Sequence, residues 1–538
     1  MGLAELYQKL TAEQRDFQFG RVGADPLTEG FPRKRVVHAG IDGTPVSPAE
    51  AQGIWHELMS RPPTGEPTQT AYIHIPFCKT KCLYCAFFQN GTDQLVEDAY
   101  VDRLVQDMER ESASPRLKDG HIHSVFIGGG TPTSLSPANA ERLLTTIRTC
   151  LPLANDYELT LEGRIHDLVP EKMDVWMAGG VNRMSLGVQS FDTKVRRQVG
   201  RLDDKETVLK NLKALEAYNQ CVTVIDLIYG LPGQDHEIWK EDLDCLIASG
   251  VDGAASTMEE KPAARPLRSV RASSGSPSSG RNRLSCPMRV LLPPAATTKE
   301  QAKMFAFARD YLNKRRFRRL SAAHWSQTNR ERSLYNTLAK RGVTMFPFGS
   351  GAGGHLDGYS TMLYRTIDTY SQAVERHEKP FMALVKQSEV QPLVNCTLEQ
   401  LEQGYFNVDA LVAADGRLTD LKWLYDLWQD QGFVSFNGVL YELTEAGEFW
   451  QVNLAQTTVE CINYLIKGEE TMSLQGVAAQ DGDETKAMSE KVLKIITAMK
   501  KAKSAGGGPT PEAMAMMTEA MKMLTPEELQ EVMKNMGK

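Results

Sequence analysis

The chain has 538 residues, enough for two or three domains with their own cores, and its 41% apolar content is ordinary for a globular protein. Its formal net charge of −7 argues against a nucleic-acid-binding protein that depends on an overall positive field. Its nine cysteines are scattered apart from one group of three, no apolar stretch is long enough to span a membrane, and no signal peptide opens the chain, so we expect a cytoplasmic protein without disulfides or membrane contact.

An N-terminal extension over residues 1–69 precedes a region, 70–254, in which β-rich runs alternate with amphipathic helical runs. This alternation predicts an α/β fold with a parallel sheet that is closed or partly closed into a barrel. In such barrels the active site forms at the carboxyl ends of the strands. The expected strands are 71–77, 123–127, 157–161, 184–188 and 222–228, and the helices between them include 93–111, 136–150 and 205–218.

Three cysteines follow the first expected strand in the spacing CxxxCxxC, at Cys78, Cys82 and Cys85. Three thiolates this close together can ligate three irons of a [4Fe–4S] cluster and leave the fourth iron open to a small molecule. A structural zinc site would need a fourth ligand, and strand alternation aims the nearby His74 away from the loop. Buried cysteines without any ligand are the remaining alternative. The spacing favours the cluster.

Glycine-rich or polar residues also follow the next expected strands. The run Gly128-Gly129-Gly130-Thr131-Pro132-Thr133 comes after the second strand, where glycines let the backbone approach a ligand closely. Glu162 follows the third strand, Gln189 and Arg201 follow the fourth, and Asp226 lies in the fifth. Each feature alone is typical of a turn or a helix cap. Their recurrence at successive strand ends predicts one ligand site around the cysteine loop.

Residues 255–297 interrupt this pattern. The part from 255 to 290 is rich in serine and basic residues and contains no aromatic residue. This composition predicts disorder, from either a frameshift or an insertion. We therefore expect the barrel to lose its sixth strand and to have an open edge.

The second half of the chain divides into three regions. Residues 298–395, which begin with an expected helix over 300–318, should complete the barrel and face the substrate. Residues 396–470 predict an α+β, winged-helix-like domain, because helical runs precede a hairpin with the turn Asn437-Gly438. Residues 471–538 predict a linker and a helical, methionine-rich tail.

Several motifs together resemble those of radical S-adenosylmethionine (SAM) enzymes, and more narrowly the oxygen-independent coproporphyrinogen III dehydrogenase-like family. They are Tyr72-Ile-His-Ile-Pro-Phe-Cys78, the glycine run at 128–133, Asn182-Arg-Met-Ser-Leu-Gly-Val-Gln-Ser-Phe191 and Asp226-Leu-Ile-Tyr-Gly-Leu-Pro-Gly233. The resemblance is strong over 68–253 and weaker over 298–450. It implies a partial (β/α)6 radical SAM barrel, a [4Fe–4S] cluster and two bound SAM molecules.

The resemblance also implies a role for each matching residue. The cluster ligands would be Cys78, Cys82 and Cys85. The contacts to the cluster-bound SAM would be Tyr72, Gly129 and Glu162. The contacts to the second SAM would be Tyr84, Gly130, Thr131, Gln189, Arg201 and Asp226. The chemistry agrees, because Glu162 can accept from an amino group and Arg201 can pair with a carboxylate.

Further motifs separate the branches of this family. Coproporphyrinogen dehydrogenases carry a fourth cysteine where this chain has Phe87, and heme chaperones carry a His-Asn-x-x-Tyr-Trp run that is absent from 333–338, the nearest stretch here. The runs Glu162-Gly-Arg-Ile-His-Asp167, Ala323-His-Trp-Ser326 and 348–358 are instead most similar to the anaerobic heme-degrading radical SAM methyltransferases, the anaerobilin synthases. A heme chaperone and a coproporphyrinogen dehydrogenase are the alternatives.

This resemblance implies a C-methyltransferase that acts on heme. The reduced cluster would cleave SAM to a 5′-deoxyadenosyl radical, which initiates methyl transfer to a porphyrin meso carbon. The macrocycle would open to a methylated linear tetrapyrrole and release its iron, with electrons from a low-potential donor such as a flavodoxin. His355 is the first candidate for a heme contact and His324 the second, although a single histidine is more often a structural group.

Overall fold

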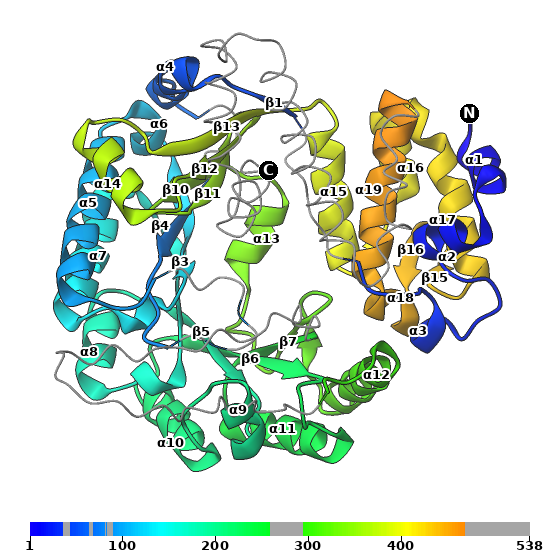
Figure 1. Ribbon diagram of the computed structural model, residues 1–538, viewed down its shortest axis with the longest axis horizontal. Helices are drawn as coiled ribbons and strands as arrows, with labels where there is room; N and C mark the ends of the chain where they lie inside the picture. The colour runs from blue at the N-terminus through cyan, green and yellow to red at the C-terminus, as the bar shows by residue number, and fades with distance from the viewer. Residues whose placement is uncertain are drawn as a thin grey trace, which may run out of the picture.

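The computed structural model describes residues 1–35, 43–63, 68–80, 82, 85, 90–258 and 294–468. Within them, one mixed sheet of thirteen strands curves into an incomplete ring with helices on its outer side (Figure 1). A second group of helices with a three-stranded sheet lies beside the open side of the ring. The expected α/β class and partial barrel are confirmed.

Six parallel neighbours form the centre of the large sheet, and helices on the outer side connect them (Figure 1). The strands are β2 (Thr68–Ile75), β3 (His121–Gly129), β4 (Leu153–Gly163), β5 (Arg183–Gln189), β6 (Val222–Tyr229) and β7 (Gly253–Met258). The connecting helices are α5 (Gln94–Ser112), α6 (Pro115–Lys118), η1 (Pro132–Ser134), α7 (Pro137–Cys150), η2 (Ile165–Asp167), α8 (Pro170–Ala178), α9 (Thr193–Gln198), α10 (Lys205–Glu216) and α11 (His236–Ser249).

Additional strands extend this sheet at both edges. Beside β2 lie β10 (Met345–Phe348), which is parallel to it, and then the antiparallel strands β11 (Gly353–Leu356), β12 (Tyr359–Leu363), β13 (Phe381–Gln387) and β1 (Gly43–Pro45). Beside β7 lie β9 (His324–Ser326) and β8 (Arg318–Arg319). The helices of this part are α4 (Pro48–Ser60), α12 (Thr298–Lys314), α13 (Leu334–Lys340) and α14 (Ile367–Glu375).

The alternation of side chains along β2 separates the two faces of the sheet. Ala71, Ile73 and Ile75 are fully buried in the core shared with the outer helices. Tyr72 lies on the opposite, inner face, where its ring stacks on Phe126 and lies near Tyr335 of α13. The helix α13 therefore occupies the inner side of the curved sheet, as Figure 1 shows.

The expectation that the barrel lacks its sixth strand is wrong. Strand β7 runs to Met258 and pairs in parallel with β6, with Asp226 opposite Ala255. On its other edge β7 pairs with β9, so the strand has hydrogen-bonded neighbours on both sides. The residues of β7 are mostly small, and they fit between β6 and β9 regardless of the residues that follow β7 in the chain. The anomalous composition concerns residues 259–293, which lie outside the described part of the chain.

Residues 1–35 and 391–467 share one hydrophobic core, here called the C-terminal module. Trp428 at the centre of this core donates from Nε1 to the carbonyl of Phe19, 2.9 Å away. The expected Asn437-Gly438 hairpin is present, joined by a third strand, β14. The elements are α1 (Leu3–Lys9), α2 (Ala12–Phe19), α3 (Pro26–Glu29), α15 (Gln391–Glu402), β14 (Tyr405–Phe406), α16 (Val408–Ala414), η3 (Gly416–Asp420), α17 (Leu421–Asp430), β15 (Val434–Phe436), β16 (Tyr441–Leu443), α18 (Glu445–Phe449) and α19 (Gln451–Lys467).

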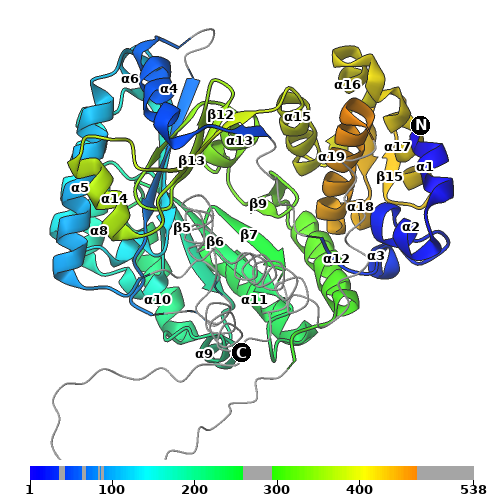
Figure 2. The same cartoon turned by 45° about the horizontal axis from the view of Figure 1, so that its top comes forward.

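The module lies next to α12, which contacts α3 and α18 (Figure 2). The helix expected over 300–318 ends at Lys314 instead, because Phe317 turns into the core and the chain continues as β8. None of the described helices is both long and apolar enough to cross a membrane. The expected helical tail, 471–538, lies outside the described residues.

Candidate active site at the carboxyl ends of the strands

The cysteine loop begins where β2 ends, and the glycine run fixes its first residues. Gly130 donates from its backbone N–H to the carbonyl of Ile75 at 2.8 Å, and Thr131 donates to the carbonyl of Phe77 at 2.7 Å. Cys78 donates to the carbonyl of Asn90 at 3.0 Å. These bonds hold the loop against the carboxyl end of β3, the edge at which barrel sites form.

Two of the three cysteine side chains are buried and the third is half-buried. Cys78 is 3% exposed and Cys82 is 2% exposed, and the Sγ of Cys78 lies 3.2 Å from the Oγ1 of Thr131. Burial raises the pKa of the Cys78 thiol, Thr131 and Arg164 oppose this, and Cys85 and Cys82 raise it further. The three thiols are therefore close enough to interact electrostatically.

The three thiols fit the cluster that their spacing predicts better than they fit a single metal ion. Among the described side chains, no group of three or more His, Cys, Asp and Glu converges closely enough to hold a single metal ion. A cubane cluster is larger than one ion and is held by thiolates at separate corners. Three neighbouring thiols without a fourth ligand fit such a cluster with an open iron. Tyr84, expected beside them, lies outside the described residues.

Two positions of the run require glycine because neighbouring atoms lie too close for a Cβ atom. Gly129 has φ +111°, and a Cβ atom on it would lie 2.6 Å from the ring of His74. A Cβ atom on Gly130 would lie 2.5 Å from the carbonyl oxygen of Phe77. The backbone at this turn therefore has no room for side chains, and its outer face is left open to a ligand.

We expect Gly129→Ala to weaken SAM binding by at least about tenfold, because the methyl group would displace His74 and strain the turn. Isothermal titration of cluster-loaded protein with SAM measures the effect. The matched control is Gly91→Ala, at a glycine with no atom within 4 Å of the added Cβ. Equal SAM affinity in the two variants would contradict the prediction.

His74 is a residue of this site that sequence reasoning set aside. Its Nδ1 lies 3.0 Å from the Tyr72 hydroxyl, and its Nε2 is buried without a hydrogen-bond partner among the described residues. Burial, with a smaller contribution from Arg365, lowers the pKa of His74 to about 4, so the imidazole is neutral. The signal was its position two residues after Tyr72, which places both side chains on the inner face.

Glu162 and Asp226 lie at the next strand ends and act on each other. The Oε2 of Glu162 accepts from the Gly129 N–H at 3.2 Å. Burial, and after it the nearby Asp226, raise the pKa of Glu162 to about 7, although the Gly129 N–H and Arg183 oppose the rise. Burial also raises the pKa of Asp226, while Arg183 and Arg201 oppose the rise. Glu162 is therefore ready to accept a cationic group beside the glycine turn.

Gln189 and Arg201 come together above Gly187. A Cβ atom on Gly187 would lie 2.7 Å from Nε2 of Gln189 and 2.8 Å from Nη2 of Arg201. Gln189 has φ +71°, at the point where the β5–β6 register shifts. Arg201 and Thr131 line one cavity of about 80 Å³ at this edge of the sheet. The structure thus brings together the described residues that were predicted for the two SAM sites.

The two histidines proposed for heme contact lie away from the cysteine loop. His355 pairs with Met345, which pairs with Thr70 at the beginning of β2, so it lies near the opposite end of the barrel. Burial lowers the pKa of His355, although its ring hydrogen-bonds to the backbone of Val343 and Gly342. These bonds indicate a structural role.

His324 lies in β9, where burial and, to a smaller extent, Arg183 lower its pKa to about 3. It lines a different cavity, of about 280 Å³, together with Lys340 and Glu402. A heme contact for either histidine stays a prediction that this placement does not favour.

Comparisons with known proteins agree with this geometry. A model of the Radical SAM superfamily matches residues 72–246. "Anaerobilin synthase" of Escherichia coli O157:H7 is 32% identical over 427 residues, which cover 78% of this chain and 90% of that protein. "Heme chaperone HemW" of Lactococcus lactis is 36% identical over 175 residues, 32% of this chain and 45% of that protein. The structure of coproporphyrinogen III oxidase (HemN) from Escherichia coli has the same fold, with a TM-score of 0.62, 19% identity and coverage of 80% of this chain and 98% of that one.

Proposed function

This chain belongs to the radical SAM superfamily, in the same family as anaerobilin synthase, and on that premise we propose that it opens the heme macrocycle anaerobically by C-methylation. The observation that carries the proposal is the match to anaerobilin synthase, which extends over 90% of that relative. Membership of the superfamily implies a [4Fe–4S] cluster and SAM. The product would be a methylated linear tetrapyrrole, and the iron would be released.

Each part of the site then has a task. Cys78, Cys82 and Cys85 would hold the cluster, which together with SAM supplies radical chemistry when bound. The carboxylate of Glu162 would receive the SAM amino group beside the turn at Gly129, with Tyr72 on the neighbouring strand. The protein positions these groups and keeps water and oxygen out.

A second SAM molecule would supply the methyl group, and its contacts would be separate from the first set. Arg201 would pair with its carboxylate, and the half-buried carboxyl of Asp226 would accept from its ribose hydroxyls. Gly130, Thr131 and Gln189 lie around the same edge, and Tyr84 would complete the set. The physical support is that Arg201 and Thr131 line one cavity while Glu162 faces the glycine turn.

The affinity for SAM should depend on pH through Glu162. Its pKa of about 7 means that the carboxyl is neutral below that pH and must lose a proton before it can receive an ammonium group. SAM affinity should therefore fall as the pH decreases below about 7, by up to about tenfold per unit, and level off above it. Titrations between pH 5.5 and 7.5 measure this. Glu162→Gln should bind SAM weakly with no such slope, and an unchanged slope in that variant would contradict the assignment.

The reaction is tested by anaerobic incubation of cluster-loaded protein with heme, SAM and a low-potential reductant such as reduced flavodoxin. We expect loss of the heme spectrum, free iron and a methylated linear tetrapyrrole by mass spectrometry. Heme that stays bound and unchanged would instead support a heme chaperone, the activity of the HemW relatives. Conversion of coproporphyrinogen III without consumption of heme would instead support a coproporphyrinogen dehydrogenase.

A further inference from the structure

The run Glu162-Gly-Arg-Ile-His-Asp167 leads from the end of β4 through Arg164 into the short turn η2 (Ile165–Asp167), and this turn segment contacts the cysteine loop. The Arg164 guanidinium donates from Nη1 to the hydroxyl of Thr80 at 2.7 Å, and the Lys79 ammonium pairs with Asp167 at 3.1 Å. Thr133 completes the contact, since its hydroxyl donates to Asp167 at 3.0 Å. Two adjacent residues between Cys78 and Cys82 are thus held by this one turn.

The turn and the loop form a wall of the 80 Å³ cavity that Arg201 and Thr131 also line. Ligand sites for whole organic molecules usually have volumes of about 300 Å³ or more. A cavity of this size can take a short polar arm, while the rest of the ligand stays outside it. The cavity opens at the carboxyl edge of the sheet, beside Cys78.

The charges in this cavity do not balance. Asp167 is paired with Lys79, and Asp203 lies 3.0 Å from the ring of His166. Arg164 is half-buried, its Nη1 donates to a neutral hydroxyl, and no carboxylate among the described residues lies within ion-pair distance of it. The cavity therefore holds a positive charge that a ligand can neutralise.

From this arrangement we propose that Arg164 recognises a carboxylate arm of the substrate, a propionate of heme, and so positions the macrocycle beside the cysteine loop. The inference rests on the proposed function. Arg201, which lines the same cavity, would pair with the carboxylate of the second SAM, so Arg164 is a further guanidinium available to a carboxylate, and heme carries two propionates. An arginine fork is suited to a carboxylate because it can donate two parallel hydrogen bonds.

The test compares heme with its dimethyl ester, in which both propionates are neutral. Cluster-loaded protein is titrated anaerobically without reductant, and the heme absorption spectrum reports binding. We expect the wild-type chain to bind heme at least about tenfold more tightly than the ester, the effect of a hydrogen bond between charged groups. Arg164→Gln should lose that preference through weaker binding of heme alone, and Arg164→Lys should keep part of it.

Controls separate this role from three others. Arg142→Gln, at an exposed arginine on α7 that pairs with Asp102, should bind both ligands like the wild type. The SAM affinity and the cluster reduction potential of Arg164→Gln should match the wild type. A variant that binds heme normally, loses SAM affinity, shifts only the potential, or weakens heme and ester equally would overturn the proposal.

Failure of the proposed function gives a different result. If that function alone is wrong, the wild type still prefers heme over the ester and Arg164→Gln still loses the preference, but heme is not consumed when SAM and reductant are added. If only the Arg164 assignment is wrong, heme is consumed and Arg164→Gln retains the preference. A wild-type chain that does not bind heme would overturn both.

Discussion

Replacing Cys82 with alanine should abolish SAM cleavage and remove the iron–sulfur cluster. Cys82 is 2% exposed and lies between the two other thiols of the loop, so the variant would leave two ligands for a cluster that needs three. We expect iron and sulfide contents near zero after anaerobic reconstitution, and no 5′-deoxyadenosine from SAM and reductant. Iron analysis, the visible absorption spectrum and product chromatography measure these outcomes.

The matched control is Cys150→Ala. Cys150 is the last residue of α7, on the outer side of the sheet, and it is half-buried like Cys85. This variant should keep the full cluster content and activity. A Cys82→Ala protein that retains a cluster and cleaves SAM would refute the radical SAM assignment of the loop, whatever the identity of the substrate.

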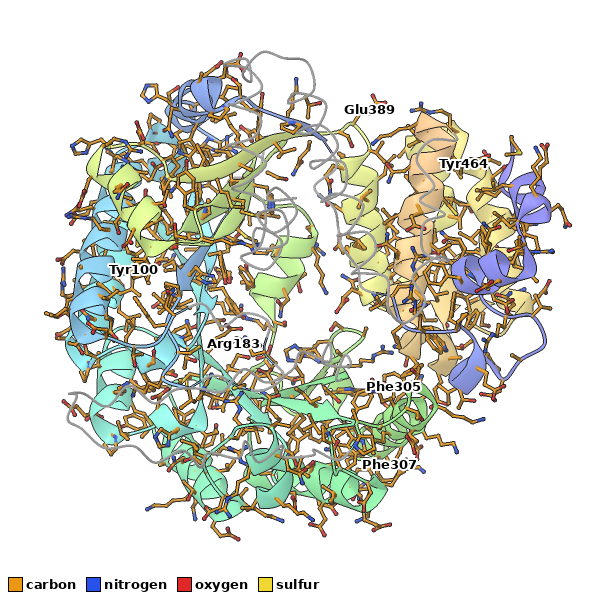
Figure 3. All side chains as sticks on the ribbon, viewed as in Figure 1. Tyr100, Arg183, Phe305, Phe307, Glu389 and Tyr464 are labelled. Carbon is orange, nitrogen blue, oxygen red and sulfur yellow. The ribbon has the colours of Figure 1, made fainter. Side chains whose placement is uncertain are left out.

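Replacing Glu331 with alanine should reduce the free energy of unfolding by about 3–5 kcal/mol, because it leaves a buried arginine charge without its partner. Glu331 is fully buried and accepts from Nε of Arg183 at 3.0 Å and from Nη2 at 3.2 Å. Arg183 lies on the inner side of the curved sheet (Figure 3), where little water can replace the lost carboxylate. His324, 3.5 Å from the same carboxylate, would lose a neighbour as well.

Urea denaturation followed by circular dichroism measures this loss in the transition of the barrel. Replacing both partners, Arg183→Met with Glu331→Met, should be much less costly than Glu331→Ala, because no unpaired charge remains. The exposed ion pair between Arg142 and Asp102 serves as the control at the surface. Asp102→Ala should reduce the free energy of unfolding by at most about 1 kcal/mol. A Glu331→Ala protein as stable as Asp102→Ala would show that the barrel interior is well solvated.

Several strands of the barrel could be predicted because most of their residues are buried and they contain short apolar runs. Strand β6, for example, was expected over 222–228 and extends over Val222–Tyr229. Its end was also recognisable as a site, since Asp226 is a carboxyl within an apolar run. The same reasoning failed for β7, whose small residues carry no apolar signal although the two neighbouring strands hold it in place.

Other features depend on partners that are distant in the sequence. Residues 1–35 contain few long apolar runs, but Leu3 and Phe19 are fully buried because they pack on helices more than 400 positions later. From the sequence, His355 was the first candidate for a heme contact and His324 the second. Only the strand register shows that His355 lies level with the start of β2, whereas Cys78 follows its end.

The sequence by itself determined the type of chemistry, because three cysteines in the spacing CxxxCxxC and a glycine run after the next strand are local patterns that follow parallel strands. The tertiary structure decided which side chains meet at that edge. Arg164 contacts Thr80, and His74 lies against Gly129, through contacts across separate strands that no spacing encodes. The physical reason is that a ligand motif depends on short-range geometry, whereas burial and net charge in a cavity depend on every strand that lines it.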